Sequence, residues 1–136
     1  MLPAIERIAM NNRMLVAAAA LVALAAGLPQ VAAAQAAANG ETLFKQRCQS
    51  CHTVTAGKVS PIGPNLNGVV GRKAAASPVA FKYSDALKKS GLTWTRPTLD
   101  KFLTAPMKMV PGTRMVISLP DATQRAALVD YLARAK

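Results

Sequence analysis

The chain has 136 residues, which is room for one domain of modest size. Seventeen lysines and arginines oppose six acidic residues, so the formal net charge is +11. A charge of this sign and size favours an acidic protein surface, an anionic membrane or nucleic acid as the partner. Nucleic acid is not expected, because the few aromatic residues are dispersed and no groove-reading or base-stacking motif is visible.

Residues 1–38 have the pattern of a secretory signal. Two arginines precede the apolar stretch 14–28, and the small residues that follow offer cleavage sites after Ala34, Ala36 or Ala38. An uncleaved membrane anchor is the alternative, although these 15 strongly apolar residues are short for a span, which needs about 20. We therefore predict a signal peptide over 1–38, one domain over 39–136 and a periplasmic location.

The first predicted helix of the domain covers residues 40–51. Leu43 and Phe44 lie on one face of it, and Asn39 is a candidate N-cap. A second helix is predicted over 95–104. Its start is marked by a threonine that can cap it and a proline in the first turn, and Pro106 should stop it.

The last predicted helix covers residues 121–135, where Asp121 and Gln124 resemble a capping box. A shorter helix is expected over 83–89. The segment 53–80 is rich in glycine, proline and serine, and so long a loop usually binds something. No segment alternates with period two, so we expect few strands or none and an all-α domain.

The motif with the clearest chemistry is Cys48-Gln-Ser-Cys51-His52. Residues three apart on a helical turn point the same way, so two thiols can add to the two vinyl groups of one haem. The adjacent His52 then falls beneath the iron and can donate a ring nitrogen. C-x-x-C-H is the signature of c-type haem attachment.

Three other interpretations of the motif compete with haem attachment. A structural zinc site needs four ligands, and the chain has two cysteines and one histidine in total. A thioredoxin-like redox pair expects a βαβ context, which is absent from the pattern. A plain disulfide would need no adjacent histidine. Haem attachment therefore remains the favoured interpretation.

The single histidine also limits the second axial ligand of the iron. With His52 on one side, that ligand must be a methionine, another residue, water or nothing. Met107, Met109 and Met115 all lie in one segment, and composition does not choose among them. A thioether ligand would raise the reduction potential.

Taken together, the motifs resemble class I cytochrome c of the mitochondrial type and its bacterial relatives. The resemblance extends from about residue 40 to 131. It rests on Gly40-x-x-x-Phe44 before the haem motif, Gly63-Pro64-Asn65-Leu66, Gly71-Arg72, Phe81-x-Tyr83-Ser84-Asp85, Thr93-Trp94, Pro111-Gly-Thr-Arg-Met115 and Leu128-x-x-Tyr131-Leu132.

The resemblance implies a fold in which the N- and C-terminal helices pack crosswise, with shorter helices and long loops around one covalent haem c. It implies that Met115 is the distal iron ligand, that Met107 and Met109 are packing residues, and that the Pro64 carbonyl accepts a hydrogen bond from His52. The implied contacts of the haem propionates are Arg72, Tyr83, Trp94 and Thr113.

The function that follows from the resemblance is one-electron transfer without catalysis, by a monomer that contacts membranes only transiently. Implied partners are the acidic docking faces of a quinol:cytochrome c oxidoreductase, and of a cytochrome c oxidase or photosynthetic reaction centre. Several of five basic residues are expected around the exposed haem edge: Lys45, Arg47, Lys58, Lys108 and Arg114. Two rival hypotheses remain: a gas sensor or peroxidase with an open iron position, and a module dedicated to one periplasmic dehydrogenase.

Overall fold

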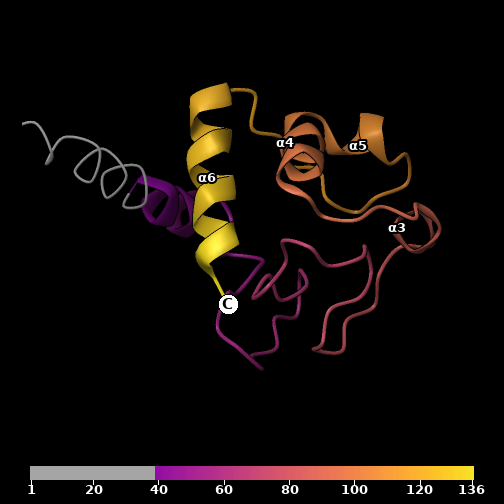
Figure 1. Cartoon of the computed structure of the whole chain (residues 1–136). Coiled ribbons are helices and arrows are strands. Elements are labelled where there is room, and N and C mark those ends of the chain that lie inside the picture. Colours follow the sequence, from indigo (N-terminus) through magenta and orange to yellow (C-terminus); the bar gives the residue numbers. More distant parts are fainter. Residues whose placement is uncertain (1–38) are drawn as a thin grey trace, which may run out of the picture. The chain divides into compact units, whose positions relative to one another are not determined.

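The computed structural model describes residues 39–136. The predicted signal peptide over 1–38 and its cleavage sites lie outside the described residues. Within the described range the chain forms a helix over residues 39–47, α3 (Asp85–Lys89), α4 (Arg96–Thr104), α5 (Pro106–Met109) and α6 (Ala122–Arg134) (Figure 1). This part of the chain has no strand beyond one isolated bridge between Lys73 and Thr93, so the all-α prediction is confirmed.

Side-chain caps determine where the later helices begin. The Thr95 hydroxyl accepts a hydrogen bond from the Thr98 amide, and the Asp121 carboxylate accepts one from the Gln124 amide at 2.8 Å. Each cap satisfies an amide that the first turn leaves without a partner. The helices α4 and α6 therefore begin one residue after the starts predicted from the sequence.

The first helix differs from the prediction at both ends. Asn39 already lies in the helix rather than at its N-cap, and the helix ends at residue 47 instead of 51. The amides of Cys48 and Gln49 both donate to the Phe44 carbonyl, at 2.8 and 2.9 Å. The second of these bonds spans five residues instead of the four of an α-helix, so the helix ends in a wider turn and the cysteines lie after it.

Pro106 also differs from its predicted role, because it begins a helix as well as ending one. A proline suits the first turn of a helix, where its missing amide hydrogen is not needed. The chain breaks after α4 at Ala105 and resumes as the four-residue helix α5.

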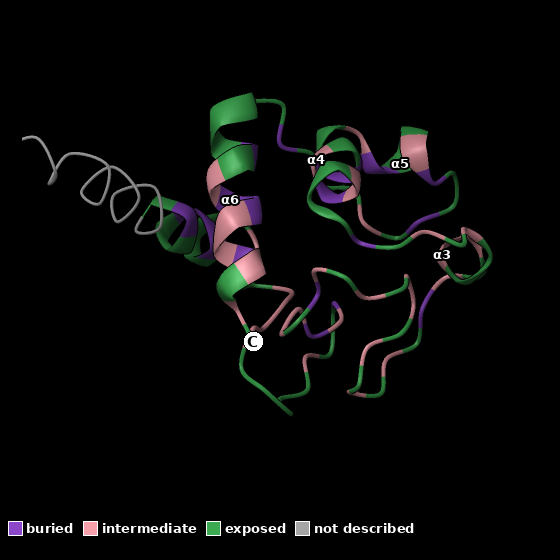
Figure 2. Cartoon of the chain, viewed as in Figure 1, coloured by how far each residue is buried: buried purple, intermediate pink, exposed green. Residues whose placement is uncertain are grey.

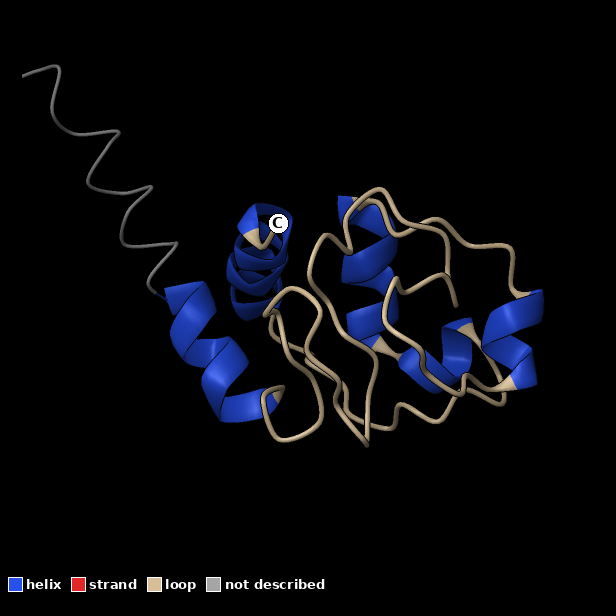
Figure 3. Ribbon diagram, turned by 90° about the horizontal axis from the view of Figure 1, so that it is seen from below, coloured by secondary structure: helices blue, strands red, loops and turns tan. Residues whose placement is uncertain are grey.

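The N-terminal and C-terminal helices cross, as expected. Figures 1 and 3 show the helix of residues 39–47 running beside α6 from two directions. Gly40 faces the Ala127 carbonyl and the Tyr131 Cβ so closely that a side chain at this position would collide with the backbone of α6. The Phe44 and Tyr131 rings lie 5.5 Å apart, and Leu128 is 1% exposed.

The core joins α4 and α6 to the first helix (Figure 2). On α4 the buried residues are Leu99, Phe102 and Leu103, and Trp94 stacks obliquely on Phe102 at 5.0 Å. In contrast, α3 has no buried residue. Among the residues that the structure describes, none of the helices has both the length and the apolar character needed to span a bilayer.

Candidate functional site

One cavity of about 430 Å³ lies between the helices and the long loops. Pockets of about 300–1,000 Å³ with mainly apolar walls are typical of cofactor sites. Its apolar wall includes Leu99, Phe102 and Leu128. The cavity is also lined by all nine site residues predicted from the sequence, which are Cys48, Cys51, His52, Pro64, Arg72, Tyr83, Trp94, Thr113 and Met115.

The two cysteines reach the cavity from the turn that follows the first helix. The Cys51 and His52 amides both donate to the Cys48 carbonyl, at 3.0 and 2.9 Å, so the C-x-x-C-H segment forms one compact turn. Burial, and secondarily the neighbouring Cys51, raises the pKa of the Cys48 thiol to about 11. Redox cysteines instead have a lowered pKa, which argues against a thioredoxin-like pair.

The His52 ring is fixed by the loop opposite. Its Nδ1 lies 2.8 Å from the Pro64 carbonyl oxygen, and since a carbonyl can only accept, Nδ1 carries the proton and donates. Burial lowers the His52 pKa, an effect that the bond to Pro64 partly opposes. Burial therefore favours the neutral ring, and with the proton on Nδ1 the neutral ring has its lone pair on Nε2, the state in which imidazole binds a metal.

This arrangement needs Gly63. The sequence motif contained this glycine but did not explain its role. A Cβ at Gly63 would lie 2.5 Å from His52 Cε1, 2.7 Å from Nδ1 and 2.8 Å from the Cys51 carbonyl oxygen. Only a residue without a side chain lets the loop approach the ring this closely.

Asn65 organises the loop that presents Pro64, a role that its place in the sequence motif did not reveal. It is 2% exposed, and its side-chain amide donates to the carbonyls of Thr55 at 2.7 Å and Lys58 at 2.8 Å. Its Oδ1 accepts from the Asn67 amide at 2.7 Å. A buried asparagine with all these bonds explains how so long a loop keeps one conformation.

Arg72 is fixed by hydrogen bonds to its own loop. Its two terminal nitrogens donate to the carbonyls of Asn67 at 2.9 Å and Asn65 at 2.8 Å, while the residue also lines the cavity. Burial lowers the pKa of Arg72, and Tyr83 opposes that shift. Backbone bonds between residues 71–72 and Trp94, each 2.8 Å long, bring Arg72 and Trp94 to the same wall.

The structure distinguishes the three methionines that the sequence left open. Met115 lines the cavity, and its amide donates to the hydroxyl of the buried Thr113 at 3.4 Å. Met109 packs against the core, as expected. Met107 is 54% exposed, so its predicted packing role is wrong. It lies on the outer face of the short helix α5, which the sequence pattern did not predict.

The charged residues of the cavity are all basic. Arg47 and Arg114 line it as expected, together with Arg72 and Lys73, whereas Lys45, Lys58 and Lys108 do not. Lys45 is instead paired with Glu41 at 2.7 Å. In the described part of the chain every acidic residue except Asp121 forms an ion pair with a nearby lysine or arginine.

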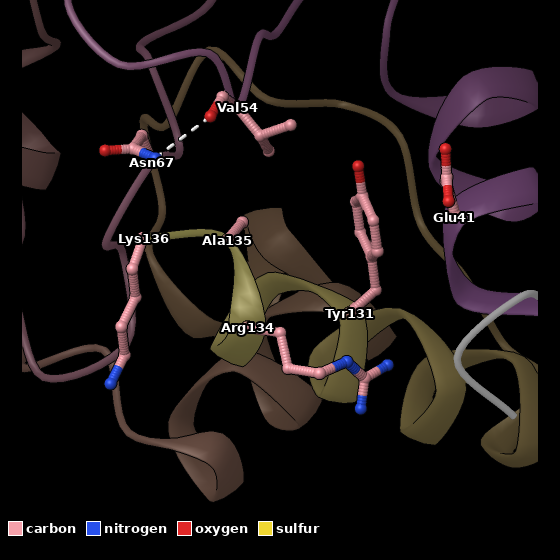
Figure 4. Close-up of a pocket in the computed structure, with 7 residues that line it drawn as sticks. All are labelled: Glu41, Val54, Asn67, Tyr131, Arg134, Ala135 and Lys136. Carbon is pink, nitrogen blue, oxygen red and sulfur yellow. Dashed lines mark hydrogen bonds between the residues drawn. The ribbon is translucent and has the colours of Figure 1, made fainter. Parts of the chain in front are cut away.

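A second, more open depression of about 470 Å³ lies between the first helix, the end of α6 and the loop around Val54. Figure 4 shows the Tyr131 ring standing in it, while the Arg134 and Lys136 side chains point away from each other. No residue predicted for the site lines this depression. Its cations do not converge, so it is not the candidate site.

The donor set fits haem c. Two thiols and a neutral imidazole come from one turn, a thioether lies in the same cavity, and the walls are largely apolar. A soft sulfur and an imidazole are the axial ligands that cytochromes c give to haem iron.

Comparisons with known proteins agree. The family model described as Cytochrome c matches residues 37–136. Cytochrome c2 of Rhodomicrobium vannielii is 48% identical over 96 residues, which cover 70% of this chain and 75% of that protein. Cytochrome c type-1 of Ascaris suum is 46% identical over 95 residues, which cover 69% of this chain and 83% of that protein.

A solved structure, cytochrome cH from Methylobacterium extorquens, superposes with a TM-score of 0.65 at 42% identity and covers 71% of this chain and 95% of that one. The chain is therefore related in sequence to cytochromes c over nearly the whole described range. It also has the crosswise terminal helices, the cavity and the C-x-x-C-H turn. The chain belongs to the class I monohaem cytochromes c, which are electron carriers with one covalently bound haem c.

Proposed function

We propose that this protein carries single electrons between periplasmic or membrane redox complexes of a respiratory or photosynthetic chain, and that it is not an enzyme. The observation that carries the proposal is the convergence of His52, Met115 and both cysteines on one cavity, with the His52 ring fixed by Pro64. In this proposal Cys48 and Cys51 form the thioethers, and His52 and Met115 are the axial ligands.

The bound haem c supplies a reversible one-electron couple. The chain orients the His52 ring through the Nδ1 bond, so Nε2 would be free to hold the iron. Met115, which lines the same cavity, would offer a soft sulfur, and a thioether ligand raises the reduction potential. The fold itself places both side chains, so the chain would need little rearrangement to hold the group.

The polar residues of the wall would hold the charged edge of the cofactor. Arg72, already half buried, offers a guanidinium beside the cavity, and the buried Tyr83, Trp94 and Thr113 lie along the same lining. Burying carboxylates without such partners would be costly. We propose that these four residues contact the haem propionates.

The charges at the cavity support acidic docking partners. Arg47, Lys73 and Arg114 line it and no acidic residue does. Exposed charges of one sign steer encounter and give rates that fall with salt. The proposed donor is a quinol:cytochrome c oxidoreductase. The proposed acceptor is a cytochrome c oxidase or photosynthetic reaction centre, which the carrier meets as a monomer in transient contact with the membrane.

The test of axial ligation is an absorption spectrum of the periplasmically matured protein, oxidised and reduced. We expect a c-type reduced spectrum and a weak band near 695 nm in the oxidised form, a general marker of a methionine–ferric iron bond. Met115→Ala should lose that band, while Met107→Ala and Met109→Ala keep it. A high-spin spectrum in the parent protein that shifts with carbon monoxide or cyanide would mean an open iron position. The proposed function would then be that of a sensor or peroxidase and not that of a carrier.

Export is tested separately by N-terminal sequencing of the mature protein. Cleavage after Ala34, Ala36 or Ala38 gives an N-terminus at residue 35, 37 or 39. A chain that still begins at Met1 and stays with the membrane fraction would mean a retained anchor.

A further inference from the structure

Arg125 is the one charged side chain that is buried in the described part of the chain, at 9% exposed. It projects from α6 and makes three hydrogen bonds. Its Nε donates to the Asp100 carboxylate on α4 at 2.7 Å. One terminal nitrogen donates to the backbone carbonyls of Leu119 at 3.0 Å and Pro120 at 2.7 Å. The guanidinium therefore joins two helices to the segment that leads away from Met115.

The segment between Met115 and these carbonyls has no backbone hydrogen bond of its own. In the described range no backbone hydrogen bond involves residues 116–118, and these residues line the cavity that the haem would fill. The next fixed point is Leu119, whose amide donates to the Leu103 carbonyl at 2.8 Å. On the other side of Met115, the exposed Arg114 donates to the Lys82 carbonyl at 3.0 Å.

We infer that Arg125, oriented by Asp100, is a positioning residue that clamps the Met115 loop and limits how often Met115 swings out of the cavity. The inference rests on the proposed function, in which Met115 is an iron ligand. A charged donor in a buried site forms stronger hydrogen bonds than a neutral one, so the two loop carbonyls are held firmly. Asp100 compensates the buried charge and aims the guanidinium at them.

A purely structural role, joining α4 to α6, is the alternative. The chain offers a matched control for it, because Arg96 on α4 and Asp130 on α6 also form an ion pair between these helices. That pair is exposed, with 53% and 39% of the two side chains accessible, and its Arg96 guanidinium bonds the Asp130 carboxylate rather than a loop carbonyl. Removing it should loosen the helices without freeing the loop.

The experiment measures imidazole binding to the ferric holoprotein by stopped flow. At high imidazole the rate reaches a limit set by departure of Met115. We expect Arg125→Lys to raise this limiting rate about tenfold or more, because an ammonium cannot reproduce the planar fork. Asp100→Asn should raise it about threefold, because the amide still accepts but carries no charge. Asp130→Asn should leave it within about 1.5-fold of the parent, as exposed pairs contribute little.

Equal limiting rates in the parent, Arg125→Lys and Asp100→Asn, or an equal rise in Asp130→Asn, would overturn the inference. If Arg125→Lys does not yield folded holoprotein, the comparison of Asp100→Asn with Asp130→Asn decides alone. Failure of the proposed function looks different. The parent protein would then lack the 695 nm band. Its observed rate of imidazole binding would also increase with imidazole concentration without reaching a limit.

Discussion

The contact between Gly63 and the His52 ring leads to a quantitative prediction for Gly63→Ala. The added Cβ would lie 2.5–2.8 Å from two atoms of the ring and from the Cys51 carbonyl oxygen, so the ring or the loop must move. Either movement stretches the 2.8 Å bond from His52 to Pro64. Overpacking typically costs about 1–3 kcal/mol, and the weakened hydrogen bond adds about 1 kcal/mol. We therefore expect the free energy of unfolding to fall by about 2–4 kcal/mol.

The same substitution should raise the reduction potential. A hydrogen bond from Nδ1 makes the imidazole a better donor and favours ferric iron, so its loss favours the ferrous form. If the bond differs by about 1 kcal/mol between the two oxidation states, the one-electron potential rises by about 40 mV. The assay is a spectroscopic redox titration of the holoprotein, paired with denaturant unfolding.

Gly57→Ala is the matched control in the same loop. Gly57 has φ +70°, and a Cβ added there would meet no atom within 4 Å, so alanine costs only the strain of the left-handed backbone, about 1–2 kcal/mol. Its potential should stay at the parent value. A Gly63→Ala potential within about 10 mV of the Gly57→Ala potential, a difference worth only about 0.2 kcal/mol, would mean that the His52–Pro64 bond does not control the potential.

Three further predictions concern packing, the loop and docking. Gly40→Ala should lower the free energy of unfolding by about 1–3 kcal/mol in a denaturant melt, because its Cβ meets the backbone of α6, whereas the exposed Gln46→Ala should stay within about 0.5 kcal/mol of the parent. Asn65→Ala should cost about 2–4 kcal/mol in the same assay, since it leaves three backbone groups without their partner; a cost below that of Asn67→Ala would contradict the loop argument. Lys73→Gln should weaken the salt dependence of electron transfer to an acidic partner, measured by stopped flow, while Arg134→Gln, which does not line the cavity, should not.

The sequence predicted best those features that depend on local chemistry. The Thr95 and Asp121 caps and the absence of strands in the described range follow from residue types at fixed spacing. The family resemblance extended these predictions to contacts between residues that are distant in the chain. The hydrogen bond between His52 and Pro64 is present as implied, and Met115 is the methionine that lines the cavity.

Features that depend on tertiary contacts do not follow from the sequence pattern. The end of the first helix is set by a shared Phe44 carbonyl, which periodicity does not reveal. The expected packing of Met107 is wrong because its exposure follows from the direction of a four-residue helix. The role of Asn65 depends on carbonyls seven and ten residues away, and that of Arg125 on a carboxylate 25 residues away. Hydrophobic pattern carries no information about such polar bonds.

The crossing of the first and last helices also affects how fast the domain closes. Gly40 meets Ala127 from nearly the opposite end of the domain, and closing a loop of about 90 residues costs roughly 4 kcal/mol of chain entropy. That cost arises before most of the contacts that offset it can form, so closure should be slow. Until α6 has docked, the Cys48–His52 turn lacks one wall of its cavity and stays open to other molecules. The time between export of residue 52 and docking of α6 is therefore a natural window for loading the cofactor.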